Sequence, residues 1–247
     1  MPLRTLVVIP TVDEAANIVD VLTRVRAEVP AADVLVVDGA SSDATVELAE
    51  TVGRELGGVQ VLRQLARNGL GGAYRSGFDW GLESGYEVLV EMDADLSHDP
   101  LDLPRLLQAV EGGAGLAIGS RYVPGGSTPD WTRGRRWLSR WANRYANALL
   151  GLRVKDATAG FRAYRAEVLR DIDFATTGAD GYAFQVEMTY RVMRTGRAVV
   201  ELPIAFRDRA LGTSKMSSRI VVEAVVLVAT WALRDRVLRR RAGRRAR

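Results

Sequence analysis

The sequence VLVEMDADLSHDP, residues 88–100, decides how the rest of the chain is interpreted. Its apolar beginning is typical of a strand inside a protein, yet two carboxylates, Asp93 and Asp95, follow directly. Side chains two residues apart on an extended segment point the same way, so these carboxylates repel each other unless a cation lies between them. Mg²⁺ and Mn²⁺ bind carboxylate and phosphate oxygens together. The stretch therefore predicts a metal and phosphate site at the end of a buried strand.

Apolar strands alternate with amphipathic helices on both sides of this stretch. The pattern predicts strands, with helices between them, over residues 5–10, 33–38, 59–64, 87–93 and 115–122. Such alternation is typical of an α/β fold with a mostly parallel central sheet covered by helices on both faces. Ligands of these sheets bind at the carboxyl ends of the strands. We therefore expect the polar side chains that end the strands to converge: Thr11, Asp38, Asp93, Asp95 and Arg121.

Beyond Arg121 the pattern is less regular. A loop rich in proline, glycine and arginine precedes a helix over residues 137–152. Residues 156–172 are expected to form a loop and then a helix. A further helix and a strand are expected over residues 181–196 and 198–206, without an internal repeat or a domain linker.

The composition excludes several kinds of site. The chain of 247 residues has no cysteine and a single histidine, His98, which excludes a disulfide, a thiolate site and a multi-histidine metal site. The first ten residues read as a strand and not as a signal peptide. The formal net charge of +4 is concentrated in residues 234–247, which hold eight arginines and one aspartate and would attract phosphates. We expect no nucleic-acid partner, because this tail has no interleaved aromatic residues.

Eight segments carry a resemblance to a known family: VVIPTVDEAANI, VVDGASSDAT, NGLGGAYRSGF, EMDADLSHDP, IGSRYVPGG, DATAGFRAYR, GYAFQVEM and PIAFRDRALGTSKMS. Between residues 5 and 217 they stand in the order seen in inverting family-2 glycosyltransferases with the GT-A fold. The segments GSRYVPGG, GYAFQVEM and GTSKM most resemble polyprenol-phosphate (dolichol-phosphate) mannosyltransferases, which move mannose from GDP-mannose to a polyprenyl phosphate. The resemblance implies a GT-A catalytic domain over residues 1–217.

The resemblance implies donor-binding roles for residues that match the family motifs. The base and ribose of the nucleotide would be held by Pro10, Val12, Glu14, Val37 and Asp38. Asp93 and Ala94 would lie along the nucleotide sugar, while Asp95, helped by Ser97, would bind Mg²⁺ or Mn²⁺.

The resemblance also implies which residues contact the two reacting phosphates. Arg121 would lie between the donor and acceptor phosphates, and Arg135 and Ser139 would hold the acceptor phosphate. Arg209 and Lys215 would close over the donor diphosphate. The expected catalytic set is Asp95, Arg121, Arg209 and Lys215.

The implied reaction needs no general base. A phosphate monoester is ionised near neutral pH and can attack the anomeric carbon directly, which inverts the anomeric centre. The protein then has to position two anions and stabilise the leaving diphosphate. A base would be needed only for a hydroxyl acceptor, and Asp180 would then be the candidate.

Two departures from the family pattern bear on the donor. The chain has PTVDE where the family has PTYNE, so Val12 replaces an aromatic residue. It has DGASSDAT where the family has DDxSxDGT, so Gly39 replaces a carboxylate near the base. A UDP-sugar such as UDP-glucose is therefore the alternative donor.

A non-catalytic protein that binds nucleotide sugar or anionic membrane is the alternative from another class. A dinucleotide-dependent dehydrogenase is disfavoured, because no GxGxxG follows the first strand.

The end of the chain predicts contact with a membrane surface. Residues 220–233 form an apolar stretch of fourteen residues that contains Glu223. A bilayer span needs about 20 apolar residues, so this stretch is too short to cross a membrane. We expect residues 218–247 to form an amphipathic helix and a basic tail that bind anionic head groups, with a buried helix and a free tail as the alternative. The chain is thus expected in the cytoplasm, attached peripherally to the cytoplasmic face of the membrane.

Overall fold

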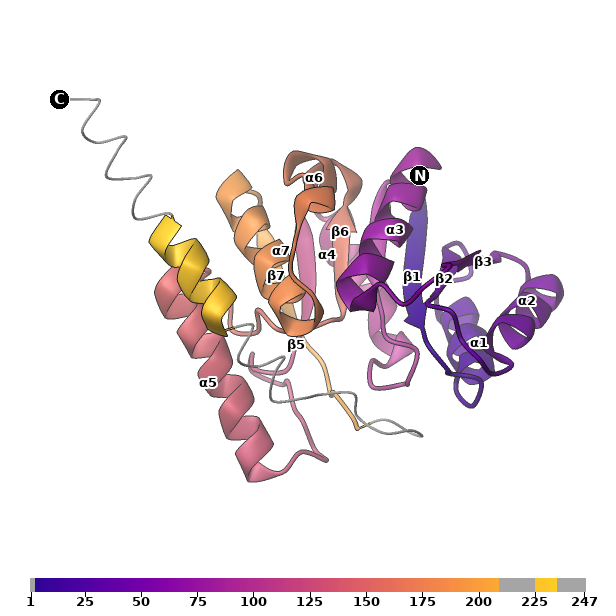
Figure 1. Cartoon of the computed structure of the whole chain (residues 1–247), viewed down its shortest axis with the longest axis horizontal. Coiled ribbons are helices and arrows are strands. Elements are labelled where there is room, and N and C mark those ends of the chain that lie inside the picture. Colours follow the sequence, from indigo (N-terminus) through magenta and orange to yellow (C-terminus); the bar gives the residue numbers. More distant parts are fainter. Residues whose placement is uncertain (1–2, 209–224, 235–247) are drawn as a thin grey trace.

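The structure is a computed structural model that describes residues 3–208 and 225–234. A seven-stranded sheet runs through its centre in the order β3-β2-β1-β4-β6-β5-β7 (Figure 1). The strands are β1 (Thr5–Thr11), β2 (Asp33–Asp38), β3 (Val59–Arg63), β4 (Val88–Glu91), β5 (Leu116–Ser120), β6 (Arg162–Arg165) and β7 (Val199–Pro203). Neighbouring strands are parallel except where β6 runs antiparallel to β4 and β5. The predicted α/β fold with a mostly parallel sheet is confirmed.

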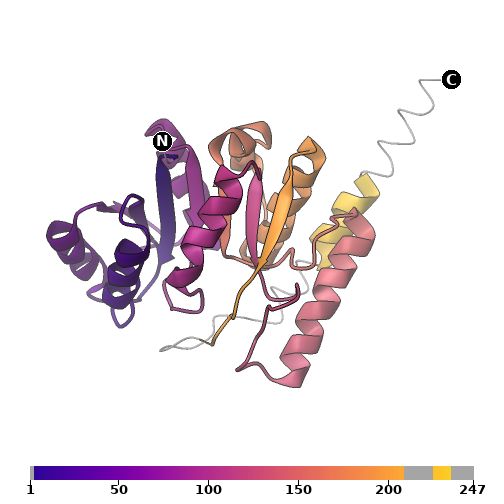
Figure 2. The same ribbon diagram turned by 180° about the vertical axis from the view of Figure 1, so that it is seen from behind.

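Helices cover both faces of the sheet. One face carries α1 (Ile18–Glu28), α2 (Thr45–Leu56) and α4 (Leu103–Glu111), seen in Figure 2. The other carries α3 (Gly69–Glu83), α5 (Arg133–Leu150), α6 (Ala166–Asp171) and α7 (Gly181–Thr195). Two short 3-10 helices, η1 (Pro100–Asp102) and η2 (Phe174–Thr176), precede α4 and α7. The two layers of helices explain why the strands read as continuous apolar runs, since both faces are buried.

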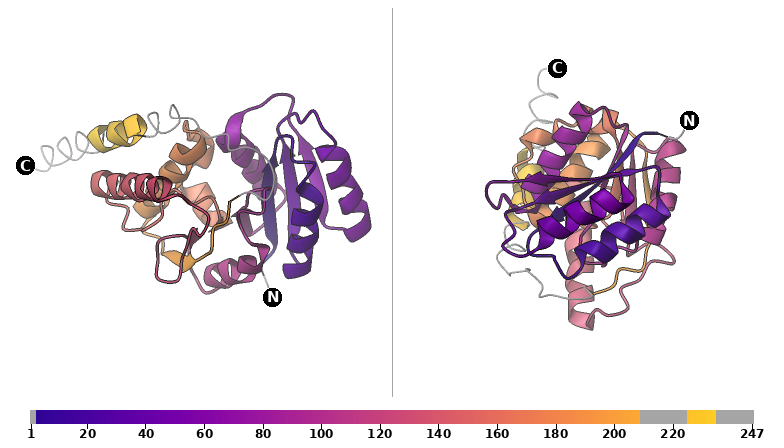
Figure 3. Two further views of the ribbon diagram at one scale, coloured as in Figure 1. Left: turned by 90° about the horizontal axis from the view of Figure 1, so that it is seen from below. Right: turned by 90° about the vertical axis from the view of Figure 1, so that its right-hand side faces the viewer.

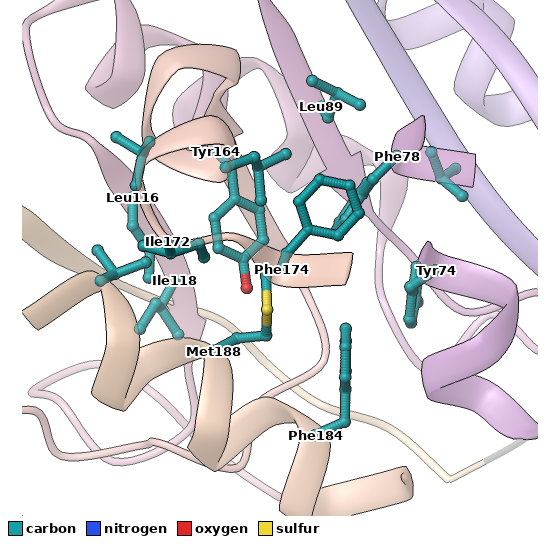
Figure 4. Packing of buried hydrophobic residues seen from close by; sticks show 14 of the residues in the cluster. Tyr74, Phe78, Leu89, Leu116, Ile118, Tyr164, Ile172, Phe174, Phe184 and Met188 are labelled. Carbon is teal, nitrogen blue, oxygen red and sulfur yellow. The ribbon is translucent and has the colours of Figure 1, made fainter. Parts of the chain in front are cut away.

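Alternate residues of the central strands belong to two separate cores. In β1, Leu6 and Val8 pack toward α3, whereas Val7 and Ile9 pack toward α1 and α4. The core beneath α3 and α7 is built around aromatic rings, shown in Figure 4. The rings of Tyr74 and Phe184 stack with their centroids 6.1 Å apart. This packing joins α3 to α7 over one face of the sheet.

Strand β6 is the element that the sequence did not predict. A loop followed by a helix was expected over residues 156–172, but a four-residue strand precedes α6. Arg162, its first residue, is fully buried, and its guanidinium donates to the carbonyl oxygens of Ala157 and Ala159, both at 2.7 Å. A short strand that begins and ends with arginine lacks the apolar run by which strands are recognised.

Residues 225–234 form a helix that packs on α5 and α7 (Figure 3). Val228 and Ala232 are buried, and the Tyr145 hydroxyl donates to the carbonyl oxygen of Val225 at 3.1 Å. The ring of Trp231 stacks on that of Tyr190. The rest of the predicted amphipathic segment, residues 218–224 and 235–247, lies outside the described residues. No helix within the described ranges is long and apolar enough to cross a bilayer.

Helix α3 lies so close to the sheet that Gly77 has no room for a side chain. A Cβ there would lie 2.4 Å from Cγ1 of Val8 and 3.2 Å from Cγ2 of Val37. We expect Gly77→Ala to lower the free energy of unfolding by about 1–3 kcal/mol, because overpacking outweighs a helix-propensity gain of about 1 kcal/mol. Gly134→Ala in α5 is the control, since nothing lies within 4 Å of a Cβ there. Denaturant unfolding measures both variants, and equal stabilities would contradict the close packing.

Candidate active site

The carboxyl ends of β1 and β2 are joined by hydrogen bonds to Asp38. The buried Asp38 carboxylate accepts from the Thr11 hydroxyl at 3.0 Å and from the Ser41 backbone N–H at 3.0 Å. The parallel register pairs Pro10 with Val37 and Thr11 with Asp38. Four of the predicted base-binding positions therefore lie together, because Val12 follows directly on this pair of strand ends.

The two departures from the family pattern contact each other. A Cβ added to Gly39 would lie 2.9 Å from Cγ2 of Val12, so the valine methyl group lies where a side chain on residue 39 would begin. Glu14 lies on the same loop, and its backbone N–H donates to the Thr45 hydroxyl at 2.8 Å. Val12, directly after β1, thus presents an apolar side chain where the family pattern has a carboxylate directly after β2.

The predicted metal-binding residues form a tight turn after β4. The Asp95 carboxylate accepts the Ser97 backbone N–H at 3.0 Å, and Leu96 between them has a left-handed backbone with φ of 62°. Asp95 and Ser97 are buried, whereas the Asp93 side chain is one-third exposed. The Ser97 hydroxyl oxygen is buried without a hydrogen-bond partner. This turn gathers two carboxylates and one unsatisfied hydroxyl.

These oxygen donors fit a hard divalent cation. Mg²⁺ and Mn²⁺ prefer carboxylate and hydroxyl oxygens to nitrogen or sulfur, and Mg²⁺ is usually held by one or two carboxylates together with substrate phosphates. Among the described residues, no group of three or more histidine, cysteine, aspartate or glutamate side chains could by itself hold a metal ion. The carboxylates of this turn therefore leave room for further oxygen ligands, which phosphates of a bound ligand can supply.

His98 contacts the turn through a hydrogen bond to its backbone. Its Nδ1 accepts the Asp93 backbone N–H at 3.1 Å. The buried ring stacks on Phe161, with centroids 5.0 Å apart, and meets the edge of Phe206. The geometry gives His98 a positioning role for the backbone of Asp93.

Arg121, directly after β5, is buried against Asp156. Its Nε and Nη2 donate to the two carboxylate oxygens at 2.7 and 2.6 Å, and its backbone N–H donates to Asp156 at 2.9 Å. Burial would lower the pKa of Arg121, but the Asp156 carboxylate outweighs burial and raises it. Burial would likewise raise the pKa of Asp156, but Arg121 holds it below its usual range. Both groups are therefore charged, and the direction of the guanidinium is fixed.

Asp156 was not predicted from the sequence, although it is held from several elements. Glu201 of β7 accepts the backbone N–H groups of Lys155 and Asp156 at 2.7 and 2.9 Å. Asn143 of α5 donates to the Thr158 hydroxyl at 3.1 Å, and that hydroxyl accepts from Arg121 at 2.7 Å. The only sign of Asp156 in the sequence was its place in the segment DATAGFRAYR, because a buried partner for a distant arginine leaves no local pattern.

The predicted acceptor-binding residues lie on the first turns of α5. The Arg135 guanidinium stacks on Trp131, with Cζ 4.1 Å from the ring centroid, and pairs with Asp208 at 2.7 Å. Arg135, Ser139 and Thr158 line a pocket between α5, α7 and residues 225–234.

The pocket becomes apolar along α5. Beyond Arg135 and Ser139 its lining continues with Ala142, Tyr145 and Ala146, and Ala146 lies about 16 Å along the helix from Arg135. Val186 of α7 and Val225 and Val228 of the helix over residues 225–234 belong to the same apolar part. A cation and a hydroxyl thus lie beside an apolar pocket, and Thr158 links that pocket to Arg121.

The glycine-rich start of α3 is bound by a carboxylate. Asp180 accepts the Gly71 backbone N–H at 2.6 Å, and a Cβ on Gly69 would lie 1.9 Å from its other oxygen. Asp180 also caps α7 by accepting the Gly181 backbone N–H at 2.8 Å. The candidate base for a hydroxyl acceptor is therefore engaged in joining two helices.

Two members of the expected catalytic set cannot be placed. Arg209 and Lys215 lie outside the described residues, which stop at Asp208 and resume at Val225. The remaining members, Asp95 and Arg121, follow β4 and β5 at the same edge of the sheet.

Comparison with known families matches the part of the chain that holds this site. The model described as "Glycosyl transferase family 2" matches residues 6–173, which include the turn after β4 and the Arg121–Asp156 pair. The chain belongs to glycosyl transferase family 2.

Two curated relatives match this family-2 enzyme along nearly its whole length. Undecaprenyl-phosphate mannosyltransferase of Micrococcus luteus is 52% identical over 234 residues, which are 95% of this chain and 96% of the relative. Polyprenol monophosphomannose synthase of Mycolicibacterium smegmatis is 49% identical over 239 residues, which are 96% of this chain and 90% of the relative.

A solved structure confirms the GT-A-like fold of the family-2 enzyme. Glucosyl-3-phosphoglycerate synthase from Mycobacterium tuberculosis in complex with uridine diphosphate has a TM-score of 0.68 at 21% identity, covering 92% of this chain and 80% of that chain. The same enzyme in complex with Mn²⁺, uridine diphosphate and glucosyl-3-phosphoglycerate has a TM-score of 0.65 at 21% identity, covering 95% and 80%.

Glu91, the last residue of β4, should make the stability of the family-2 enzyme depend on pH. It is fully buried opposite Arg162, and burial raises its pKa from 4.5 to about 7, although Arg162 opposes the shift. Folding therefore favours the protonated carboxyl, so its stabilising contribution is complete below about pH 4.5 and is lost as the pH rises through about 7. We expect Glu91→Gln to avoid a loss on the order of 3 kcal/mol. Unfolding free energies at pH 5 and pH 8 test this, and a variant-to-wild-type difference independent of pH would contradict it.

Proposed function

We propose that this family-2 enzyme transfers mannose from GDP-mannose to a polyprenyl phosphate, with inversion at the anomeric carbon. The observation that carries the proposal is the pocket, in which Arg135 and Ser139 adjoin an apolar lining. An anion-binding group beside an apolar pocket suits an acceptor that has a phosphate at the end of a hydrocarbon chain. The two relatives that match nearly the whole chain are both named after a polyprenyl carrier and mannose, which supports the same acceptor class and sugar here.

The donor would lie at the carboxyl ends of β1, β2 and β4. Its base and ribose would contact the converging ends of β1 and β2, namely Pro10, Val12, Glu14, Val37 and Asp38. Its diphosphate and sugar would lie along Asp93, Ala94 and Asp95. Support comes from the general rule that ligands of such sheets bind where parallel strands end.

A divalent cation, Mg²⁺ or Mn²⁺, would be held by Asp95 and the hydroxyl of Ser97. When bound, such a cation would offset negative charge on the leaving diphosphate. The unsatisfied Ser97 hydroxyl and the fixed Asp95 carboxylate support this assignment. The Mn²⁺ complex of the structurally similar synthase supports a divalent cation in this fold.

The acceptor phosphate would act as the nucleophile without a general base, because it is already ionised. Arg121 and Arg135 would bring it to the anomeric carbon against repulsion from the donor diphosphate. Arg209 and Lys215, outside the described residues, would contact the donor diphosphate. An oxygen of the acceptor phosphate would form the new bond to the anomeric carbon as the bond to the diphosphate breaks, which inverts that carbon.

One observation favours a second donor. The carboxylate that the family usually has after β2 is missing, and Val12 fills the space beside Gly39. Guanine presents N–H groups that could donate hydrogen bonds to a carboxylate. Because this carboxylate is missing, a UDP-sugar such as UDP-glucose is the alternative donor.

A transfer assay tests the reaction. Purified enzyme would be incubated with radiolabelled GDP-mannose, UDP-glucose or UDP-GlcNAc, together with a polyprenyl phosphate and Mg²⁺ or Mn²⁺. We expect label to pass from GDP-mannose into the lipid phase, and we expect Asp95→Ala to lower kcat by roughly 10²–10³-fold, because the diphosphate loses its charge stabilisation. The matched control is Asp99→Ala, since that carboxylate caps η1 by accepting the Leu101 backbone N–H.

The other outcomes of the assay separate the alternatives. Label moving only from a UDP-sugar would overturn GDP-mannose and would point to Val12 and Gly39. Binding of nucleotide sugar without transfer from any donor would favour a non-catalytic binder.

Peripheral attachment to the cytoplasmic face of a membrane follows from the same proposal. Helix α5 contains five arginines and no acidic residue. It exposes Trp137, Leu138 and Trp141, and the helix over residues 225–234 exposes Val226 and Leu233. Arginine, tryptophan and leucine together are typical of helices that lie in the membrane interface. The basic residues after position 234 would add attraction to anionic head groups.

Vesicle binding tests the membrane contact. We expect the double variant Trp137→Ala/Trp141→Ala to bind phosphatidylglycerol vesicles roughly 10-fold more weakly, because two large apolar side chains no longer leave water. Leu65→Ala/Leu101→Ala is the control, since both leucines are exposed elsewhere on the molecule. Co-sedimentation measures the bound fraction, and equal binding by the two double variants would exclude α5 as the contact surface.

A further inference from the structure

The two arginines of the proposed acceptor site each pair with a carboxylate, and the pairs differ in burial. The side chains of Arg121 and Asp156 are 4% and 0% exposed, whereas those of Arg135 and Asp208 are 35% and 45% exposed. The buried pair is bidentate, so breaking it would leave a charge without a partner inside the protein. The exposed pair is joined by a single hydrogen bond, which Nη1 of Arg135 donates to a carboxylate oxygen of Asp208. An incoming anion can therefore displace the carboxylate only at Arg135.

Backbone hydrogen bonds of Phe206 and Asp208 hold the Asp208 segment beside Arg135. The Asp208 backbone N–H donates to a carboxylate oxygen of Asp130 at 3.1 Å, and the Phe206 backbone N–H donates to the carbonyl oxygen of Ser127 at 3.0 Å. The Phe206 ring also meets the edge of Trp131, on which Arg135 stacks. These contacts involve the main chain of Phe206 and Asp208, the Asp130 carboxylate and the Phe206 ring, so they do not need the Asp208 carboxylate. Its charge can be removed without removing what holds the segment.

We propose that Asp208 is a positioning residue that competes with the acceptor phosphate for Arg135. This inference rests on the proposed function, because it takes Arg135 as a ligand of the acceptor phosphate. With no phosphate bound, Asp208 holds the Arg135 guanidinium against Trp131. A phosphate that reaches Arg135 meets a second anion at ion-pair distance, and the two repel each other. The carboxylate therefore lowers the affinity of the site for every prenyl phosphate. Because this includes the glycosylated product, the carboxylate also favours product release.

The size of the effect follows from the exposure of the pair. Exposed ion pairs change an equilibrium constant by about 1.4- to 5-fold. We expect Asp208→Asn to lower the Kd for farnesyl phosphate, a short prenyl monophosphate, by that factor. A residue with a merely structural role would give the opposite sign, since its loss would loosen the site and weaken binding.

Isothermal titration of the full chain with farnesyl phosphate tests the inference without any turnover. Four proteins form a double-mutant cycle: wild type, Asp208→Asn, Arg135→Gln and the double variant. We expect Asp208→Asn to raise the affinity when Arg135 is present. In the Arg135→Gln background the same substitution should leave the affinity unchanged. Asp208→Glu should bind as the wild type does, because it keeps the charge. Asp20→Asn on α1 is the matched control for net charge, since Asp20 pairs with Arg24 at 2.8 Å on an exposed surface.

Each other outcome overturns a defined statement. Unchanged or weaker binding by Asp208→Asn overturns the role of Asp208, even where the transfer assay succeeds. The same gain in the Arg135→Gln background, or in Asp20→Asn, replaces competition for Arg135 with a general charge effect. Absence of binding by all four proteins overturns both the inference and the prenyl phosphate acceptor. Binding with the expected pattern but without mannosyl transfer supports the inference and overturns the proposed reaction alone.

Discussion

The buried ion pair between Arg121 and Asp156 joins the two halves of the site. Charges removed from water are tolerated only when they are paired and their remaining hydrogen-bonding groups are satisfied. Here a backbone N–H and the hydroxyl of Thr158 complete the pair, and Glu201 holds the backbone that carries Asp156. The pair and its supporting contacts thus fix the end of β5, the segment before β6 and the middle of β7 relative to one another. Any shift of one strand would expose or break a charge contact.

The antiparallel strand β6 explains how this pair can form. Because β6 runs against its neighbours, it begins at the edge where β4 and β5 end, and Arg162 pairs with Glu91 and Ile118 there. The segment that carries Asp156 therefore enters the sheet beside Arg121. The same strand separates β4 from β5, which places the turn after β4 about two strand spacings, roughly 10 Å, from Arg121. A donor on one side of β6 and an acceptor phosphate on the other would both reach the space above it.

The sequence predicted the parts of the site that follow long apolar runs. The turn at Asp93 and Asp95 and the position of Arg121 were recognisable because each comes directly after a strand buried on both faces. Strand β6 and Asp156 were not, since pairing with a distant arginine depends on tertiary contacts and leaves no periodicity. The pocket could not be predicted from the sequence either, because it forms where α5, α7 and the helix over residues 225–234 meet. The local sequence pattern was thus enough to find charged residues at strand ends, whereas their partners became visible only in the packed structure.

The contact between Val12 and Gly39 gives the unusual end of β1 a physical interpretation. In the parallel register these residues follow the pair Thr11 and Asp38, so they are neighbours although 26 positions separate them. Restoring an aspartate at position 39 alone would press its Cβ against the valine methyl group at 2.9 Å. The two departures therefore act as one exchange, in which the side chain that follows β1 takes the place of the side chain that would follow β2. A base bound here would meet an apolar methyl group in place of a carboxylate, so its identity would have to be read by backbone groups and by other side chains.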